Sequence, residues 1–329
     1  MSQGNSNVVP EVIEPDLPII DSHHHLWVNA SGPYLIGEFS ADLALGHRVE
    51  ASVYVECNSM YRRSGPPELR SVGEAEFVSG MGAMADSGLF GPARICAAFV
   101  GAADLSMGAA VDPVLDALSA ASGGRFRGVR GFAAWDASPG MNLTRPYAAR
   151  GILLDSGFRA GFERLAQRNL VYDAWQYHPQ LPELCSLADA FPQTTIVVNH
   201  CGGLLGIGPY AGPETFGNWK GLVTEVARRP NTVMKLGGLG GHRCGFDFAS
   251  RTAPPSAQEL AKLWGPYIET CIELWGPNRC MFESNFPPDH VAGSYRTVWN
   301  ALKLTATKFS ASEKSEMFSG TARRVYRIE

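Results

Sequence analysis

Hydrophobic and polar positions alternate along the chain in eight similar units. Each unit begins with a short run, several of them rich in valine, isoleucine and aromatic residues, and an amphipathic stretch of helical spacing mostly follows. The predicted strands span residues 17–25, 51–57, 93–100, 126–133, 170–178, 194–200, 232–238 and 279–285. The clearest helical stretches span residues 112–122, 155–168, 180–191, 219–229 and 257–275. This alternation predicts parallel strands joined by helical crossovers.

The positions of the polar residues decide between two architectures. Eight strand–helix units in about 300 residues fit a closed barrel, but an open, doubly wound sheet shows the same alternation. Polar residues gather at the carboxyl ends of the strands, and they meet only if the strands form a ring. We therefore predict an α/β fold, a single-domain (β/α)8 TIM barrel over residues 17–329, with the active site at that end. Residues 1–16 are predicted to form a flexible N-terminal tail.

Composition restricts the partners that this barrel can have. Apolar residues make up 45% of the 329 positions and charged residues 18%, as in ordinary globular proteins. The net charge of -4 includes no basic block and no apolar run reaches membrane length, so neither nucleic acid nor membrane is expected. The seven cysteines form no CxxC pair, which favours a reducing, cytoplasmic location. The expected partner is a small-molecule substrate, and a homodimer is compatible with the sequence.

Histidines are concentrated at the predicted strand ends. His23 and His25 end the first strand on one face, and His24 points to the other, because side chains alternate across a strand. Such a pair can bind one metal ion, or can form a metal-free hydrogen-bonded pair. His178 precedes a proline and by itself fits an ordinary turn, whereas the glycines after His200 permit close approach of the backbone. Together, these four histidines indicate one site at the ends of strands 1, 5 and 6.

The segments DSHHHLW, QYHPQLPEL, NHCGG and MFESNFPPD resemble, in this order, the amidohydrolase-related (amidohydrolase 2) family of TIM-barrel hydrolases and decarboxylases. Within that family the chain is most similar to the branch of sugar and dicarboxylate lactonases, over residues 17–328. The resemblance implies a metal-dependent hydrolase with zinc or manganese. His23, His25, His178 and His200 would hold the metal, and His178 and His200 would also take part in catalysis.

The eighth strand departs from the family pattern. The family ends this strand with an aspartate that binds the metal and handles the proton of the attacking water, but here Asn285 stands there. An amide is no base and a poor zinc ligand, although it can hydrogen-bond a water or a substrate oxygen. Glu283, on the same strand face, is one candidate base, and Asp289 or His290 in the next loop is another. The remaining alternative is a site without tightly bound metal.

Two further residue groups bear on the substrate. In the second strand, polar Tyr54 and Glu56 alternate with valines, and we expect the polar residues to face the barrel interior and the valines the helices. Arg130 in the fourth strand is suited to grip a substrate carboxylate, unless it pairs with Glu56. Trp135 and Trp175 are candidates for the aromatic wall of the pocket.

Two expectations concern less specific features. Residues 58–73 follow the second strand and form a candidate lid, since loops of this length are often functional. Lys235 in the seventh strand is expected to pair with Glu283, which would give that glutamate a structural role.

These features predict a hydrolase that cleaves a lactone, or a related C–O or C–N bond, of a small carboxylated molecule by attack of an activated water. One alternative is a decarboxylase of an aromatic or unsaturated acid, but such relatives keep the aspartate that Asn285 replaces. Another is a non-catalytic small-molecule binder on a degenerated barrel, against which the retained histidines argue.

Overall fold

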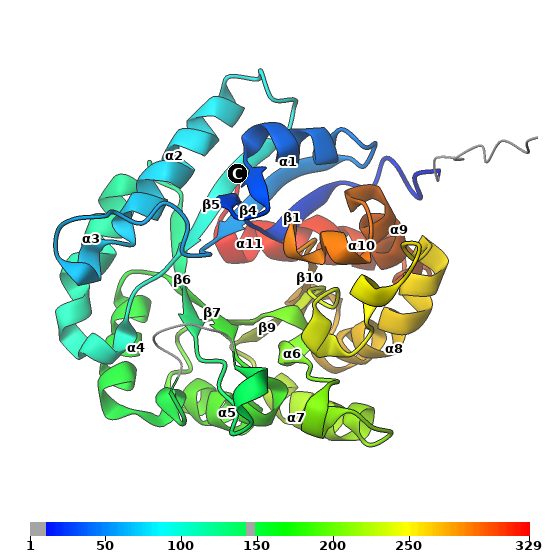
Figure 1. Cartoon of the computed structure of the whole chain (residues 1–329). Helices are drawn as coiled ribbons and strands as arrows, with labels where there is room; N and C mark the ends of the chain where they lie inside the picture. Colours follow the sequence, from blue (N-terminus) through cyan, green and yellow to red (C-terminus); the bar gives the residue numbers. More distant parts are fainter. Residues whose placement is uncertain (1–10, 143–148) are drawn as a thin grey trace, which may run out of the picture.

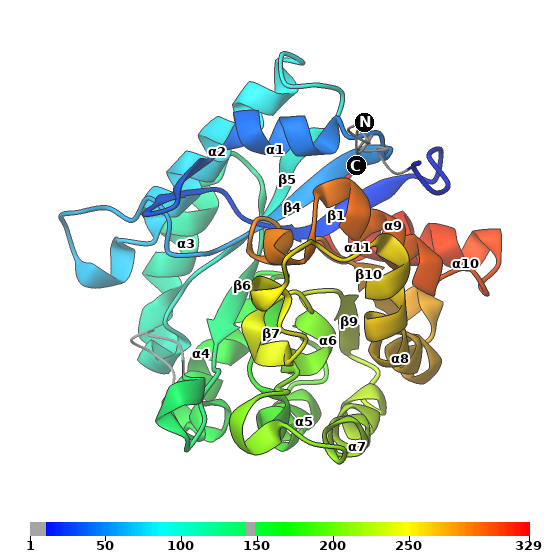
Figure 2. The same cartoon turned by 45° about the vertical axis from the view of Figure 1, so that its right-hand side comes forward.

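Eight parallel strands form one sheet that curves into a barrel, with helices around the outside (Figures 1 and 2). The computed structural model describes residues 11–142 and 149–329. Hydrogen bonds from Asn285 N to His23 O (3.0 Å) and from His25 N to Phe286 O (2.8 Å) join the last strand to the first. The predicted TIM barrel is therefore confirmed. In order of pairing, the strands are β1 (Ile19–His24), β4 (Val49–Val55), β5 (Arg94–Gly101), β6 (Phe126–Phe132), β7 (Val171–Trp175), β8 (Ile196–Val198), β9 (Thr232–Leu236) and β10 (Cys280–Phe282).

The helices mostly follow the strands in sequence and cover the barrel wall. Their predicted ranges agree within a few residues, and residues 257–275 form one helix as expected. A short hairpin of β2 (Trp27–Asn29) and β3 (Gly32–Tyr34) follows β1. The helices are α1 (Ile36–Leu43), α2 (Val72–Asp86), α3 (Asp112–Ala121), α4 (Ser156–Gln167), α5 (Leu181–Ala190), α6 (His200–Gly203), α7 (Thr215–Ala227), α8 (Ala257–Trp275), α9 (Tyr295–Thr305), α10 (Ala311–Ser315) and α11 (Thr321–Tyr326). Within the described ranges, no helix is both long and apolar enough to cross a membrane.

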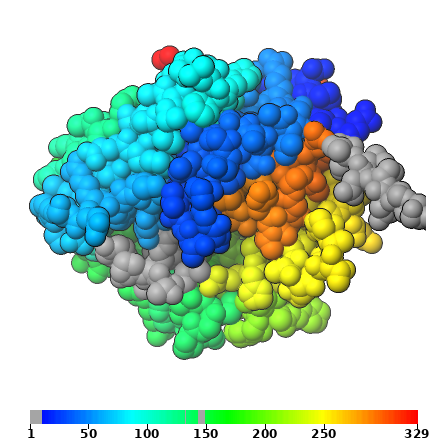
Figure 3. Space-filling view, turned by 45° about the horizontal axis from the view of Figure 1, so that its top comes forward, coloured from blue at the N-terminus to red at the C-terminus, as the bar shows by residue number. Residues whose placement is uncertain are grey.

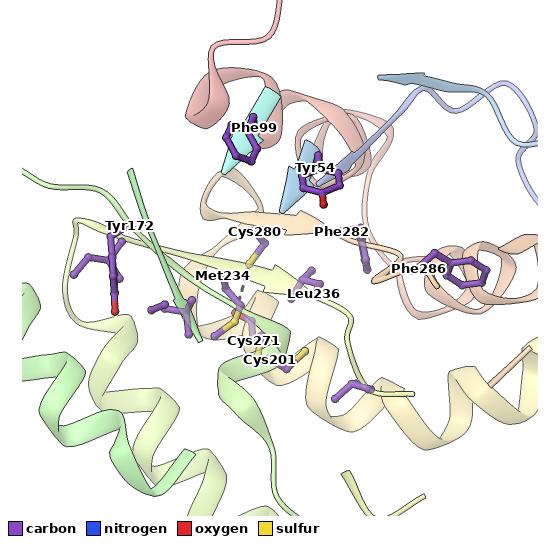
Figure 4. Packing of buried hydrophobic residues seen from close by; sticks show 14 of the residues in the cluster. Tyr54, Phe99, Tyr172, Cys201, Met234, Leu236, Cys271, Cys280, Phe282 and Phe286 are labelled. Carbon is purple, nitrogen blue, oxygen red and sulfur yellow. Dashed lines mark hydrogen bonds between the residues drawn. The ribbon is translucent and has the colours of Figure 1, made fainter. Parts of the chain in front are cut away.

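Small aliphatic side chains fill the inside of the barrel, and larger aromatic side chains fill the space between the strands and the helices. The interior holds alanines and branched aliphatic residues of the strands, with one methionine from β10 and a tyrosine from α11 at the bottom. The larger aromatic residues lie between the strands and the helices, where Figure 4 shows Tyr54, Phe99 and Tyr172. An eight-stranded barrel is just wide enough for side chains to fill, which explains this division.

The predicted orientation of β4 is wrong. Val53 and Val55 belong to the interior cluster, whereas Ser52 and Tyr54 face the helices. Ser52 Oγ lies 2.9 Å from Nε2 of the outward-facing His24, and Tyr54 OH donates to Oε1 of Glu74 on α2 at 2.9 Å. The narrow interior accepts branched aliphatic side chains, and α2 supplies the partner that a buried tyrosine hydroxyl needs. Tyr54 therefore does not line the barrel mouth as we expected of a substrate-binding residue.

Three buried cysteines gather where α8 packs on β9 and β10. Figure 4 shows Cys201, Cys271 and Cys280 in this part of the core. Burial raises the pKa of Cys271 and Cys280, so both thiols stay protonated and act as small apolar side chains. All seven cysteines are free.

The N-terminal segment packs against an element from the other end of the chain. Ile13 N donates to Oδ1 of Asn300 at 2.8 Å, and Lys303 Nζ donates to Glu14 O at 2.7 Å. In Figure 3 the segment near residue 295 lies beside the N-terminal elements. The described part of the predicted tail, residues 11–16, is thus attached to α9, and residues 1–10 lie outside the described ranges.

Candidate active site

Three histidines and one glutamate meet at the carboxyl ends of the strands. His23 and His25 come from β1, His200 follows β8, and Glu283 follows β10; all four are buried. The Nε2 atoms of His23 and His25 are 3.2 Å apart, and the ring centroids of His23 and His200 are 4.6 Å apart. His24 points outward and stacks on a phenylalanine of α1, as the alternation along the strand predicted.

Each of the three imidazoles has an oxygen beside its Nδ1 atom. Nδ1 of His25 donates to Val55 O at 2.7 Å, because a carbonyl can only accept. Nδ1 of His200 donates to Oε1 of Glu283 at 2.7 Å. Oε2 of Glu283 is 3.0 Å from Nδ1 of His23, although within the described part of the chain this oxygen makes no hydrogen bond of good geometry. Protonation at Nδ1 leaves a lone pair on Nε2 of His25 and of His200 for a ligand, whereas Nε2 of His23 lies 3.4 Å from Nη1 of Arg130.

Electrostatics keeps the β1 histidines neutral. Burial lowers the pKa of His23 well below its usual range, and the charges of Lys235, His200 and His25 lower it further. Burial, and to a smaller extent the charge of Arg130, also lowers the pKa of His25 well below its usual range. Neutral imidazole is the form that binds metals. Glu283 holds two rings at once, so its main task is to orient His23 and His200.

The predicted ion pair between Lys235 and Glu283 is wrong. Lys235 Nζ donates to Oδ2 of Asp173 at 2.7 Å, and both side chains are completely buried. The same Nζ lies 3.3 Å from Nδ1 of His23. Tyr326 OH donates to Oδ1 of Asp173 at 2.9 Å. Sequence reasoning missed Asp173, although its place two residues from Val171 in a buried strand put it on the interior face.

The donor set fits a divalent metal ion. In a tetrahedral zinc site with bonds near 2.0–2.1 Å, two ligand atoms lie about 3.3 Å apart, close to the 3.2 Å between the two Nε2 atoms of β1. One ligand atom each from His23, His200 and Glu283 lies within 4.8 Å of the others. The buried Glu283 carboxylate, whose Oε2 has no good hydrogen-bond partner among the described residues, supplies the compensating negative charge. His23, His25 and His200 would hold the ion, with Glu283 beside it.

His178 lies apart from this group. Its Nδ1 accepts a hydrogen bond from Leu205 N at 3.1 Å, and its ring packs edge-on against Tyr210. Burial lowers its pKa to about 4. It is not a member of the metal-ligand group found among the described residues, so its role as a ligand or a catalyst stays a prediction.

Asn285 is bound to the aspartate that follows it by four residues. Its Nδ2 donates to Oδ1 of Asp289 at 2.8 Å, and Gly240 N donates to Oδ2 of Asp289 at 3.0 Å. Burial and, to a smaller extent, the charge of Glu283 raise the pKa of Asp289 to about 7, although these two hydrogen bonds lower it. A carboxyl group that ionises near neutral pH suits a general base. His290, the other candidate in this loop, is exposed and packs against Phe286.

Arg130 forms an ion pair with Glu56, which the sequence indicated as the alternative to Arg130 binding a substrate carboxylate. Arg130 Nε donates to Oε1 of Glu56 at 2.8 Å, and both side chains are buried. Both residues line a cavity of about 320 Å³, and Nη1 of Arg130 lies 3.4 Å from Nε2 of His23. The candidate lid contributes Asn58, Tyr61 and Ser71 to the same cavity. The predicted residues are thus brought together, but the charge of Arg130 is already compensated.

The two candidate tryptophans differ in their surroundings. The ring of Trp175 lies 6.4 Å from the ring of His200, so it is placed to form a wall of the site. Trp135 is half-buried, its backbone N donates to Gln180 Oε1 at 2.9 Å, and its ring faces Arg150. Of these two tryptophans, only Trp175 has a ring contact with the histidine group among the described residues.

Two glycines after β9 make room for the site. A Cβ atom on Gly238 would overlap the ring of His200, and one on Gly237 would overlap Glu283. Gly238 has a φ of +64°, a conformation that other residues rarely adopt. Sequence reasoning missed both, and the repeated glycines after the strand (LGGLGG) were the available signal.

This site and fold define a class of barrel enzyme, and comparison with known proteins identifies the family. The family model described as amidohydrolase matches residues 20–328. The chain therefore belongs to the amidohydrolase family.

Individual relatives are more distant. An uncharacterised protein of Sinorhizobium fredii is 35% identical over 171 residues, 52% of each chain. An L-fucono-1,5-lactonase of Burkholderia multivorans is 28% identical over 185 residues, 54% of this chain and 58% of that protein. The chain thus matches these two relatives over slightly more than half of their length. A zinc-bound amidohydrolase structure from Burkholderia multivorans superposes with a TM-score of 0.73 at 24% identity, covering 94% of this chain and 99% of that chain, and shows the shared fold.

Proposed function

We propose that this protein is a hydrolase that opens the ring ester of a small lactone at the barrel mouth. The observation that carries the proposal is the group of buried imidazoles of His23, His25 and His200, each with its Nδ1 beside an oxygen, and with the Nε2 atoms of His23 and His25 3.2 Å apart. The similarity to an L-fucono-1,5-lactonase supports a lactone as the substrate. The pairing of Arg130 with Glu56 favours an uncharged, hydroxylated lactone over the carboxylated molecule that the sequence predicted.

The reaction adds water to the ester carbonyl and breaks the ring C–O bond. A zinc or manganese ion held by the three histidines would polarise the carbonyl and acidify the attacking water. Asp289 accepts the proton of that water, which its pKa of about 7 allows near neutral pH. The proton then passes to the ring oxygen, which leaves as the hydroxyl of the hydroxy acid. Asn285 holds Asp289 in place through its hydrogen bond.

A lactone panel tests this function. Purified protein supplied with zinc or manganese is given neutral aldonolactones, dicarboxylate lactones and simple esters, and acid release is followed with a pH indicator. We expect hydrolysis of neutral lactones and a loss of about 10²-fold or more in His200→Ala. His242→Ala serves as the matched control, because His242 is exposed. If no lactone or ester is hydrolysed by the wild-type protein, the proposal fails.

The same preparation distinguishes the alternatives. Release of carbon dioxide from hydroxybenzoates without lactone hydrolysis would show a decarboxylase. Saturable binding of a lactone without turnover, unchanged by added metal, would show a binding protein.

A further inference from the structure

A second cavity lies at the amino-terminal end of the barrel, opposite the histidines. Its volume is about 360 Å³, and residues at the starts of β7, β8 and β9 and just before β10 line it together with α11. Val171 and Val233, which belong to the interior cluster, form part of its wall. In Figures 1 and 2, α11 lies on the side of β1 and β4, and Arg323 of α11 reaches Glu50 on β4. Helix α11 therefore covers the amino-terminal end of the barrel near β1 and β4, and the cavity lies on the opposite side, near β7, β8 and β9.

The lining of this cavity is polar and positively charged. It includes Arg279, Arg324 and Arg327, and no lining residue in the described part of the chain is acidic. This concentration of arginines contrasts with the whole chain, in which 32 acidic residues outnumber 28 basic ones. Asn169 and Thr195 add neutral polar groups to the lining. The charge here is a local property of the barrel bottom.

The arginines are only partly neutralised by the protein. The side chain of Arg327 is exposed and has no hydrogen bond or ion pair with any residue in the described ranges, whereas its backbone N donates to Arg323 O. Burial of part of this side chain lowers its pKa. Arg279 donates to main-chain carbonyls, including those of Trp275 at 3.0 Å and Ala227 at 3.1 Å, and has no carboxylate partner among the described residues. Arg324 alone meets a carboxylate, that of Glu316 at 3.1 Å.

A fourth arginine increases the local positive charge. Burial lowers the pKa of Arg127, the neighbouring charge of Arg327 lowers it further, and the charge of Glu329 raises it. Guanidinium groups that lie close together repel one another, and those that are partly buried also lose solvation, which costs free energy. An anion bound among them offsets both costs.

We propose that this cavity binds an oxyanion, the phosphate group of a small molecule or free phosphate. The planar guanidinium groups of Arg324 and Arg327 match the geometry of phosphate oxygens. The volume is of the order that ligand pockets have, about 300–1,000 Å³. This site is separate from the catalytic mouth, so the inference does not depend on the proposed lactone hydrolysis.

The test is titration with inorganic phosphate of protein purified without phosphate. Binding is measured by calorimetry and by the rise in melting temperature, against sodium chloride at the same pH and ionic strength. We compare the wild type, Arg324→Gln/Arg327→Gln, and Arg251→Gln, whose exposed arginine lies elsewhere on a loop. Saturable binding in the wild type and in Arg251→Gln is expected, weakened about tenfold or more in the double variant.

Several outcomes would overturn the proposal. These are no saturable binding in the wild type, an effect that sodium chloride reproduces, or equal affinity in the wild type and the double variant. If the double variant does not fold, Arg327→Gln alone decides, because the exposed side chain of Arg327 makes no hydrogen bond in the described part of the chain and the substitution keeps the backbone bond to Arg323. Parallel titration with glycerol 3-phosphate distinguishes free phosphate from a phosphorylated small molecule as the ligand. Tighter binding of glycerol 3-phosphate than of inorganic phosphate indicates a phosphorylated small molecule.

Discussion

At the scale of single residues, one carboxylate organises the site and another titrates near neutral pH. Glu283 accepts from Nδ1 of His200 at 2.7 Å and lies 3.0 Å from Nδ1 of His23. Asp289 is held by Asn285 and Gly240, and its pKa is raised by burial to about 7. The amide at position 285 thus places a carboxylate beside the site through one hydrogen bond. In the proposed reaction, Asp289 takes the place of the aspartate that the resemblance led us to expect at position 285.

Asp289→Asn tests this assignment. We expect a loss in kcat of about 10²-fold or more, because the amide cannot accept the proton of the water. In the wild type, kcat/KM should rise with pH through about 7, since Asp289 acts only when ionised. The measurement is the pH–rate profile of both proteins on the best lactone. If kcat/KM of the wild type does not rise near pH 7, or if the variant shows the same rise, the general base is a residue other than Asp289.

The same pKa predicts a change in stability with pH. Asp289 releases its proton near pH 3.8 when unfolded but near pH 7 when folded. Its contribution to stability is therefore fully present below pH 4 and is lost as the pH rises to about 7. In Asp289→Asn this part of the pH dependence should be absent from urea unfolding curves.

At the scale of elements, the loop after β9 decides whether the histidine group can form. Gly238 lies against the ring of His200, and Gly237 lies against Glu283. The strands place the catalytic side chains at one end of the barrel, but this loop determines the space that they have. The backbone conformation of a connecting segment is therefore as important as the strand ends.

Gly238→Ala should separate this effect from a general loss of stability. The new Cβ overlaps the His200 ring, and its φ of +64° costs about 1–2 kcal/mol for alanine. Displacing His200 by about 1 Å should lower kcat about 10²-fold. Gly241→Ala in the same loop is the matched control, because its Cβ would have no neighbour within 4 Å. Equal kinetics of the two variants would contradict this role of Gly238.

At the scale of the whole molecule, a buried polar network crosses the barrel. Lys235 on β9 pairs with Asp173 on β7, and Tyr326 on α11 donates to the same aspartate. The network joins the C-terminal helix to strands that are far from it in sequence. It lies between the apolar lower interior and the histidines, and Lys235 Nζ contacts His23.

Removing the cation should leave Asp173 charged and buried. Lys235→Met is expected to lower the free energy of unfolding by roughly 3–5 kcal/mol, as for other broken buried pairs. Urea unfolding measures the change. The double variant Lys235→Met/Asp173→Asn should regain part of the loss, because no uncompensated charge remains. A single variant as stable as the wild type would show that the pair is not a net structural requirement.

Much of the fold follows from local rules in the sequence. The strand–helix alternation gave all eight barrel strands, because hydrophobic periodicity is a property of neighbouring residues. The same rule placed His23 and His25 on one face and His24 on the other. His200 joined them because the carboxyl ends of parallel strands meet at one end of a barrel.

The tertiary structure decided which partner each buried polar group found. The sequence shows that Tyr54 alternates with valines. Only the radius of the barrel determines whether the valines or the polar residues face the interior. Lys235 pairs with Asp173, Arg130 pairs with Glu56, and Asn285 donates a hydrogen bond to Asp289. These contacts form because closure of the barrel brings distant strands and loops together. Periodicity along a chain fixes the side on which a residue lies, whereas its contacts depend on the register and packing of segments that are far apart in sequence.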